Sequence, residues 1–230
     1  MGAIAASITI TLSLFGLAGL TSSALNRSGH GQKDPAPVSF DEDGTTSAFS
    51  ATASLEGRLE ELTYFQAYEG VTYEKEALVY VPPTYTPGTP ANIVYLTHGW
   101  WGTADGLAEG VAPIVDQLTS AEAIAPTIVV FATYYPDRSF ATEDYEDDYA
   151  LNRFFATTEI DTLIEAVESR YTTYARGDTS DESLRASRRH RAFGGFSMGA
   201  TTTWDMFALR PQYFYGYMPM AGESWIGREE

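Results

Sequence analysis

Residues 190–199 read His-Arg-Ala-Phe-Gly-Gly-Phe-Ser-Met-Gly, an apolar run that ends in a Gly-x-Ser-x-Gly pattern around Ser197. A serine on a very tight turn between a strand and a helix has strained backbone angles, and glycine on both sides removes side chains that would collide there. The hydroxyl then stands clear of the sheet, and the first N–H groups of the helix favour an anion beside it. The stretch therefore predicts a strand, a nucleophilic serine and a helix, in that order.

A second motif, Thr97-His98-Gly99-Trp100-Trp101-Gly102, follows directly after another apolar stretch. Hydrolases with such a serine turn take one oxyanion-hole N–H from the residue after the serine and another from a loop in this place. We therefore expect the backbone N–H groups of Met198 and Trp100 to form the oxyanion hole, with Trp101 as the alternative loop donor. His98 is expected to brace the loop by hydrogen bonds rather than to act as a general base. The two tryptophan rings either wall an acyl pocket or pack on the surface.

Apolar stretches of strand length alternate with helical patterns from about residue 57 onward. Continuous apolar runs are typical of strands that are buried on both faces. Alternating strands and helices predict an α/β fold with a mainly parallel central sheet and helices on both faces. Strands are expected over 59–65, 75–81, 92–97, 127–132, 190–196 and 213–220, helices over 110–121, 147–174 and 201–209, and a polar excursion over 176–188.

The amino-terminal part of the chain has a different composition. Residues 1–26 carry no charged side chain and include a long apolar stretch. This is typical of a signal peptide, expected over 1–25, although the stretch is also long enough for an uncleaved membrane anchor. Residues 26–56 are rich in Ser, Thr, Gly, Ala, Pro and Asp, which predicts a disordered linker. The folded domain is expected over 57–230.

Composition excludes several classes of function. The formal net charge is −17, from 14 Lys and Arg against 31 Asp and Glu, and it disfavours nucleic acid as a partner because phosphates need a basic surface. The chain has no Cys, so it has no disulfide, no thiolate metal site and no cysteine nucleophile. His30, His98 and His190 lie far apart without ligand spacing, so no metal site is expected.

The stretch 187–199, followed by Thr202-Thr203-Trp204, resembles the putative-esterase family, and especially feruloyl esterase domains of bacterial xylanases in carbohydrate esterase family one. Further similar stretches extend the resemblance over about residues 57–230; they are 79–83, 95–99 and 218–227. The resemblance implies an α/β-hydrolase fold. It also implies cofactor-free hydrolysis of hydroxycinnamoyl esters of plant cell-wall polysaccharide such as arabinoxylan. Related esterases for acetyl or other acyl groups share these motifs. Trp101 and Trp225 are candidate residues of the substrate pocket.

One part of the expected active site is not found in the sequence. A serine nucleophile needs a His to take its proton and an acid to orient that His, and in this fold both follow the serine. No His follows Ser197 in the 230 residues. We therefore expect a truncated sequence, without its last strands and helix, whose triad acid and His are not in this chain and which is inactive alone. Glu223 is a minor candidate for the acid, and Asp205 is expected to be solvated or to cap a helix.

Three functions stay open at this point. The first is a secreted or cell-surface serine esterase of feruloyl-esterase type, which touches a membrane only through its amino-terminal segment if that segment is not cleaved. The second uses the same fold to transfer the acyl group to a sugar hydroxyl. The third is an inactive hydrolase fragment that binds polysaccharide, and the intact serine turn and loop motif argue against it.

Overall fold

The structure is a computed structural model that describes residues 54–227. The expected signal peptide or anchor and most of the expected linker lie outside the described residues. At the expected boundary, the N–H groups of Glu56 and Gly57 donate to the buried Asp116 carboxylate at 2.9 and 2.7 Å. The linker over residues 26–56 and the domain over 57–230 stay predictions. Among the described residues, no helix has both the length and the apolar character needed to cross a membrane.

Within residues 54–227, six strands form one sheet in the order β1-β2-β4-β3-β5-β6. Strands β3 to β6 run parallel, and the hairpin of β1 and β2 joins β4 in antiparallel pairing. The strands are β1 (Arg58–Tyr68), β2 (Val71–Val81), β3 (Asn92–Thr97), β4 (Thr127–Ala132), β5 (Arg191–Phe196) and β6 (Gly216–Met220). The predicted mainly parallel α/β sheet is confirmed, and the prediction that further strands and a helix follow stays a prediction.

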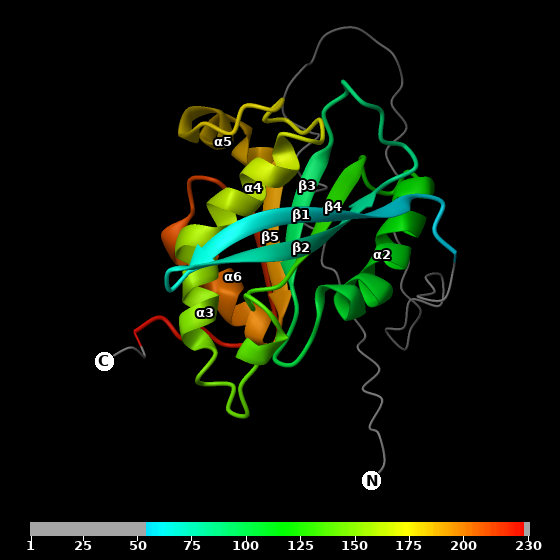
Figure 1. Ribbon diagram of the computed structural model, residues 1–230. Helices are drawn as coiled ribbons and strands as arrows, with labels where there is room; N and C mark the ends of the chain where they lie inside the picture. The colour runs from blue at the N-terminus through cyan, green and yellow to red at the C-terminus, as the bar shows by residue number, and fades with distance from the viewer. Residues whose placement is uncertain (1–53, 228–230) are drawn as a thin grey trace, which may run out of the picture.

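Helices cover both faces of the sheet (Figure 1). On one face lies α2; on the other lie α3, α4, α6 and the π-helical turn η3 between α3 and α4. Their bounds, with those of α5 and the 3-10 turns η2 and η4, are α2 (Ala104–Ser120), η2 (Arg138–Phe140), α3 (Tyr149–Phe154), η3 (Phe155–Glu159), α4 (Ile160–Glu168), α5 (Asp181–Ser187), η4 (Arg188–His190) and α6 (Met198–Leu209).

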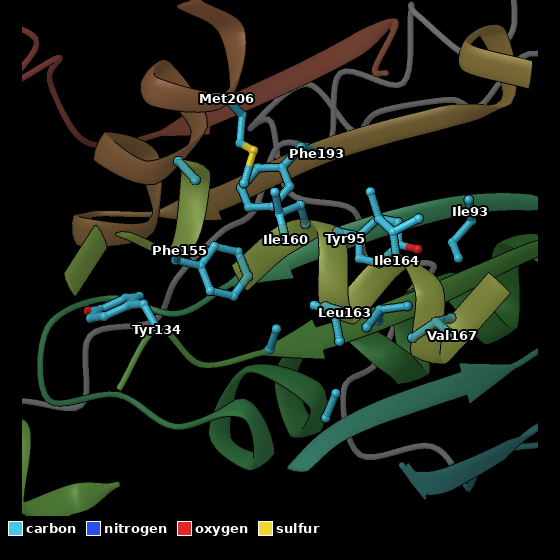
Figure 2. Close-up of a cluster of buried hydrophobic side chains, with 14 of the residues drawn as sticks. Ile93, Tyr95, Tyr134, Phe155, Ile160, Leu163, Ile164, Val167, Phe193 and Met206 are labelled. Atoms are coloured by element: carbon cyan, nitrogen blue, oxygen red, sulfur yellow. The ribbon is translucent and has the colours of Figure 1, made fainter. Parts of the chain in front are cut away.

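The apolar run of β3 feeds two separate cores, because successive side chains of a strand point to opposite faces. Ile93 and Tyr95 join the larger cluster with α4, whereas Val94 and Leu96 join the cluster under α2. Figure 2 shows the larger cluster, in which Leu163 of α4 lies over the sheet. Burial on both faces explains why this strand reads as a continuous apolar run.

Several predicted element bounds are wrong for local reasons. Helix α2 begins at Ala104 rather than near residue 110, because the Thr103 hydroxyl accepts the Gly106 N–H at 3.0 Å and caps the first turn. The long helix expected to reach residue 174 ends at Glu168, since the following chain leaves it to pair with the start of β3, where the Ala91 N–H donates to the Thr172 carbonyl. The polar excursion over 176–188 contains α5.

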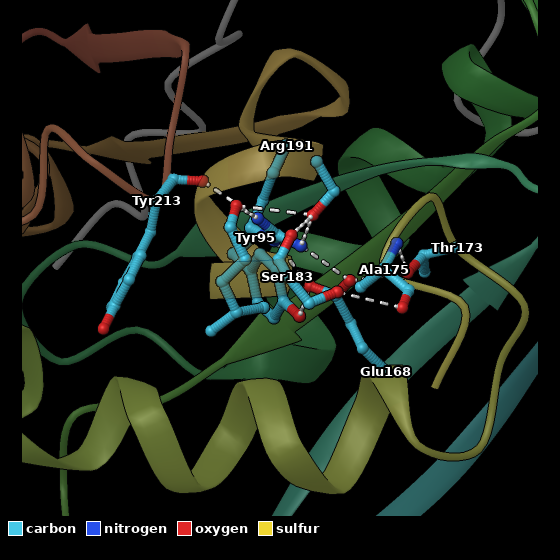
Figure 3. A network of polar contacts seen from close by, with 9 residues as sticks. Tyr95, Glu168, Thr173, Ala175, Ser183, Arg191 and Tyr213 are labelled. Atoms are coloured by element: carbon cyan, nitrogen blue, oxygen red, sulfur yellow. Dashed lines mark hydrogen bonds and ion pairs between the residues drawn. The ribbon is translucent and has the colours of Figure 1, made fainter. Parts of the chain in front are cut away.

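A buried ion pair fixes the start of β5, the strand that leads to Ser197. Arg191 donates through Nε and Nη2 to the two carboxylate oxygens of Glu168 at 2.6 and 2.9 Å, and both side chains are almost fully buried. The remaining lone pairs of the Glu168 carboxylate accept hydrogen bonds from the hydroxyls of Tyr95 and Thr173 (Figure 3). Such a satisfied bidentate pair ties α4 to β5 and holds the strand in one position.

Candidate active site

Ser197 occupies the sharp turn that its neighbouring glycines predict. It lies between the end of β5 and the first residue of α6, with φ 54° and ψ −111°. A Cβ on Gly195 would lie 2.3 Å from the Gly199 carbonyl oxygen, and one on Gly199 would lie 2.3 Å from the Thr97 carbonyl oxygen. Both positions therefore require glycine. This is the steric requirement that the Gly-x-Ser-x-Gly motif predicts.

The turn is also held from the side of β6. The Ser197 N–H donates to the Met220 carbonyl at 2.8 Å, and a Cβ on Gly222 would lie 2.3 Å from the Ser197 carbonyl oxygen. Backbone groups of β3 and of the segment after β6 thus enclose the serine turn. This packing supports a left-handed conformation that a serine rarely adopts.

The loop after β3 lies directly against Ser197. A Cβ on Gly99 would be 3.2 Å from the Ser197 Cβ. The loop closes as a four-residue turn in which the Gly102 N–H donates to the Gly99 carbonyl at 2.9 Å. The structure therefore brings together the serine and the loop, which are about 100 residues apart in the sequence, as their positions at the carboxyl ends of neighbouring parallel strands require.

The two candidate loop donors differ in what their N–H groups face. The Trp101 N–H interacts with the Tyr135 hydroxyl and acts to lower the pKa of that phenol, although burial, the larger effect, raises it to about 12. Among the described residues, the N–H groups of Trp100 and Met198 have no hydrogen-bond partner. This difference favours Trp100 and Met198 as the oxyanion donors.

His98 braces the loop, as the sequence predicts. Its Nδ1 lies 2.7 Å from the Gly99 carbonyl oxygen and its Nε2 lies 2.8 Å from the Thr133 hydroxyl, so Nδ1 donates and Nε2 accepts. Burial lowers the pKa of His98 to about 4, and the positive charges of Arg138 and Lys75 act in the same direction. A neutral ring with both nitrogens engaged cannot take the proton of Ser197.

His190 is equally unsuited to be the base. It lies before β5, at the opposite end of the strand from Ser197, which at 3.3 Å per residue is roughly 20 Å away. Its Nδ1 lies 2.9 Å from the Asn92 amide oxygen, and its ring stacks on Tyr174 at 3.4 Å between centroids. Within residues 54–227, neither histidine can therefore serve Ser197 as a general base.

Comparison with known proteins identifies the family of this chain. The family model described as "Putative esterase" matches residues 71–222, which is more than half of the chain and includes the serine turn and the loop. The chain belongs to the putative-esterase family. This match confirms the family that the sequence predicts. The α/β-hydrolase fold is confirmed as well, because solved feruloyl esterases share it.

Relatives of this chain include a xylanase and solved feruloyl esterases. It is 33% identical over 165 residues to endo-1,4-beta-xylanase Y of Acetivibrio thermocellus, covering 70% of this chain and 14% of the xylanase. A mutant feruloyl esterase module from Clostridium thermocellum, complexed with sinapinate, is 32% identical with a TM-score of 0.62, covering 74% of this chain and 56% of that one. A CE1 ferulic acid esterase from Anaeromyces mucronatus, 19% identical with a TM-score of 0.56 over 73% and 59% of the chains, shares the fold. The chain thus spans little more than half the length of these structures.

Aromatic side chains gather beside the loop of residues 97–102. Trp100 and Trp101 are 37% and 51% exposed, and their rings meet edge to face at 6.0 Å. Tyr145 contacts Trp100 at 6.1 Å and Trp225 at 5.5 Å between ring centroids. Trp225 itself is only 5% exposed and packs between the rings of Tyr149 and Tyr145, so of the exposed rings it supports that of Tyr145. The predicted pocket role of Trp101 and Trp225 stays a prediction.

Sequence reasoning missed two residues of this surface, Tyr145 and Arg138. Both lie in the connection between β4 and α3, where no motif or periodicity marks them. Tyr145 reaches the loop through Trp100, and Arg138 donates hydrogen bonds to loop carbonyls. A run of acidic residues around Tyr145 was the only local feature, and it does not point to either contact.

The expected role of Asp205 as a solvated or capping residue is wrong. Asp205 is fully buried on the inner side of α6, and the Tyr149 hydroxyl donates to its Oδ1 at 3.3 Å. The helix faces the core there, so a polar partner from α3 replaces water. Glu223 is exposed, and its carbonyl oxygen accepts from the Thr201 hydroxyl at 3.2 Å. The minor candidacy of Glu223 as the triad acid stays a prediction.

Proposed function

We propose that this esterase is a serine carboxylic-ester hydrolase of feruloyl-esterase type, acting on hydroxycinnamoyl esters of plant cell-wall polysaccharide such as arabinoxylan. The observation that carries the proposal is the left-handed Ser197, which lies against a loop whose Trp100 N–H, like that of Met198, has no partner among the described residues. A nucleophile beside N–H groups that can bind an oxyanion is the arrangement that acyl transfer requires.

In this reaction the Ser197 Oγ attacks the ester carbonyl carbon and gives its proton to a general base. The negative charge that develops on the carbonyl oxygen is stabilised by the N–H groups of Trp100 and Met198. The ester C–O bond then breaks, the sugar alcohol leaves with a proton, and water hydrolyses the acyl-enzyme. Because neither His98 nor His190 can act as the base, the base and its acid partner in this reaction lie outside residues 54–227.

The substrate class rests on the exposed aromatic rings and on the relatives. Trp100, Trp101 and Tyr145 offer flat apolar surface next to Ser197, which suits a planar hydroxycinnamoyl group better than an acetyl group. The relative solved with sinapinate is a feruloyl esterase module. We infer from this that the acyl group is aromatic and that the alcohol is a cell-wall sugar.

A fluorophosphonate probe tests the nucleophile. The full-length protein is expected to be labelled at Ser197, to release ferulate from methyl ferulate and feruloylated arabinoxylan, and to lose both properties in Ser197→Ala. Folded full-length protein that neither reacts with the probe nor releases ferulate would contradict the proposal. Product analysis with a competing sugar alcohol distinguishes hydrolysis from acyl transfer, since transfer yields a new sugar ester.

We further propose that the protein is secreted or held at the cell surface through its amino-terminal segment. A polysaccharide substrate outside the cell and the apolar stretch in residues 1–26 both support this. Amino-terminal sequencing of protein recovered from the culture medium is expected to begin after residue 24 or 25. Recovery of the protein only from the soluble cell contents, with an intact amino terminus, would contradict it.

A further inference from the structure

Arg138 lies on a short turn that is fixed independently of the active site. The Asp137 carboxylate accepts the Ser139 N–H and hydroxyl at 2.8 and 2.5 Å, which caps the 3-10 turn that begins with Arg138. Phe140 at the end of the turn packs against Tyr68 and Tyr73 of the β1–β2 hairpin. The backbone of Arg138 is therefore anchored from both sides, although its side chain is exposed.

The Arg138 guanidinium binds the loop that faces Ser197. Nη1 donates to the Gly102 carbonyl at 2.7 Å and Nη2 donates to the Trp101 carbonyl at 3.2 Å. Its Cζ also lies 5.7 Å from the Trp101 ring centroid and 5.6 Å from that of Tyr135. A planar fork with several donors can hold two consecutive carbonyls at once, which a lysine cannot do in the same way.

The contacts of Arg138 include Trp101, which is the residue of the loop with a strained backbone conformation. Trp101 has φ 59° and is the third residue of the four-residue turn from Gly99 to Gly102, a position usually taken by glycine or asparagine. A bulky residue keeps such a conformation only when its surroundings enforce it. His98 holds the first carbonyl of the turn from the inside, and Arg138 holds the last two from the outside.

We propose that Arg138 is a positioning residue of the oxyanion loop: by binding the Trp101 and Gly102 carbonyls, it keeps the turn in the conformation that directs the Trp100 N–H toward the oxyanion. This inference rests on the proposed function for its catalytic meaning. Arg138 donates to the backbone of the loop and needs no contact with substrate. Its loss therefore affects the transition state, where the oxyanion forms, more than ground-state binding.

The test compares Arg138→Ala and Arg138→Lys with Arg170→Ala in the full-length protein. Arg170 is a matched control because it is also exposed, lies 5.6 Å from the Tyr171 ring and pairs with a carboxylate, Glu60, but does not contact the loop. We expect kcat for methyl ferulate to fall about 10- to 100-fold in Arg138→Ala, with KM changed less than about threefold, because misplacing a catalytic donor acts on kcat. Arg170→Ala is expected to retain the wild-type kcat.

Two further measurements separate positioning from a general structural role. Millimolar guanidinium is expected to restore part of the kcat of Arg138→Ala, whereas ammonium at the same concentration is not. The kcat of Arg138→Lys should be nearly as low as that of Arg138→Ala. Hydrogen–deuterium exchange of the peptide that covers residues 98–103 should rise in Arg138→Ala and stay unchanged in Arg170→Ala. This second readout needs no activity, so it tests the positioning even if wild-type protein proves inactive and the proposed function fails.

Other outcomes would overturn the inference. Unchanged exchange of the loop peptide in Arg138→Ala would show that Arg138 does not hold the turn. Wild-type kcat in Arg138→Lys would show that charge alone is needed and not the two hydrogen bonds. A fall in kcat that guanidinium does not rescue and that accompanies an equal loss of thermal stability would assign Arg138 a structural role only.

Discussion

Gly199 of helix α6 and Thr97 of strand β3 are in backbone contact, so close that a Cβ on Gly199 would lie 2.3 Å from the Thr97 carbonyl oxygen. Thr97 ends β3 and Gly199 is the second residue of α6, so this contact sets how near the serine turn comes to the oxyanion loop. Neither partner can yield easily, because Thr97 also forms the parallel ladder with β4 and β5.

Gly199→Ala is therefore expected to destabilise the protein by about 3 kcal/mol or more, since the added methyl meets backbone rather than a flexible side chain. Urea unfolding measures the loss. Gly110→Ala in α2 is the matched control, because its Cβ would meet nothing within 4 Å. That change should raise stability by about 0.5–1 kcal/mol. Equal effects of the two substitutions would contradict the close contact.

The strain at Ser197 predicts an ordering of variants. Ser197→Gly should be more stable than Ser197→Ala by about 1 kcal/mol, because glycine tolerates φ 54° whereas alanine keeps the strain. Both variants should fail to react with a fluorophosphonate. Thermal unfolding of the two proteins side by side checks the ordering, and an alanine variant as stable as the glycine variant would show that the turn is not strained.

The burial of His98 predicts how stability depends on pH. The pKa of a His in the unfolded chain is about 6.5, whereas the pKa of His98 is about 4 in the folded protein. Between these values the unfolded chain holds more protons, so stability falls as the pH falls from 6.5 to 4, by about 3 kcal/mol in total.

Denaturant unfolding of wild type and His98→Gln across this pH range isolates the contribution of His98. The glutamine variant loses the braces and should be less stable at pH 7, but the difference from wild type should shrink as the pH falls. A difference that stays constant down to pH 4 would contradict the low pKa. NMR titration of the His98 ring provides a direct second measurement.

The Glu168–Arg191 pair predicts a large effect of removing one partner only. Glu168→Gln should cost about 3–5 kcal/mol, because it leaves the buried Arg191 charge without its counter-charge. In contrast, Asp181→Asn in the exposed pair of Asp181 with Arg185 should cost less than about 0.5 kcal/mol. Thermal or urea unfolding checks both. Similar losses in the two variants would mean that the buried pair does not hold β5.

Tyr145 should affect the recognition of aromatic acyl groups. Tyr145→Ala removes the ring that contacts both Trp100 and Trp225, so we expect KM for methyl ferulate to rise about 3- to 10-fold, the value of one aromatic contact. The KM for a small acetyl ester should stay within about twofold, because that ester is too short to use the contact. An equal rise for both esters would place Tyr145 outside the acyl-binding surface.

Local patterns in the sequence determined much of this protein. The glycines around Ser197 predicted the serine turn, and the continuous apolar runs predicted strands buried on both faces, because sterics and burial act on neighbouring residues. The bracing role of His98 also followed from its place in the loop. The family resemblance added the α/β-hydrolase fold.

Only the tertiary structure decided the contacts between distant segments. Arg138 and Tyr145 meet the loop because the chain after β4 returns over the carboxyl edge of the sheet, and no periodicity marks either residue in the sequence. Asp205 is buried because its face of α6 packs inward near Tyr149, whereas a charged residue in a helix is usually solvated. Such contacts depend on how elements pack in space, and one-dimensional patterns do not contain that information.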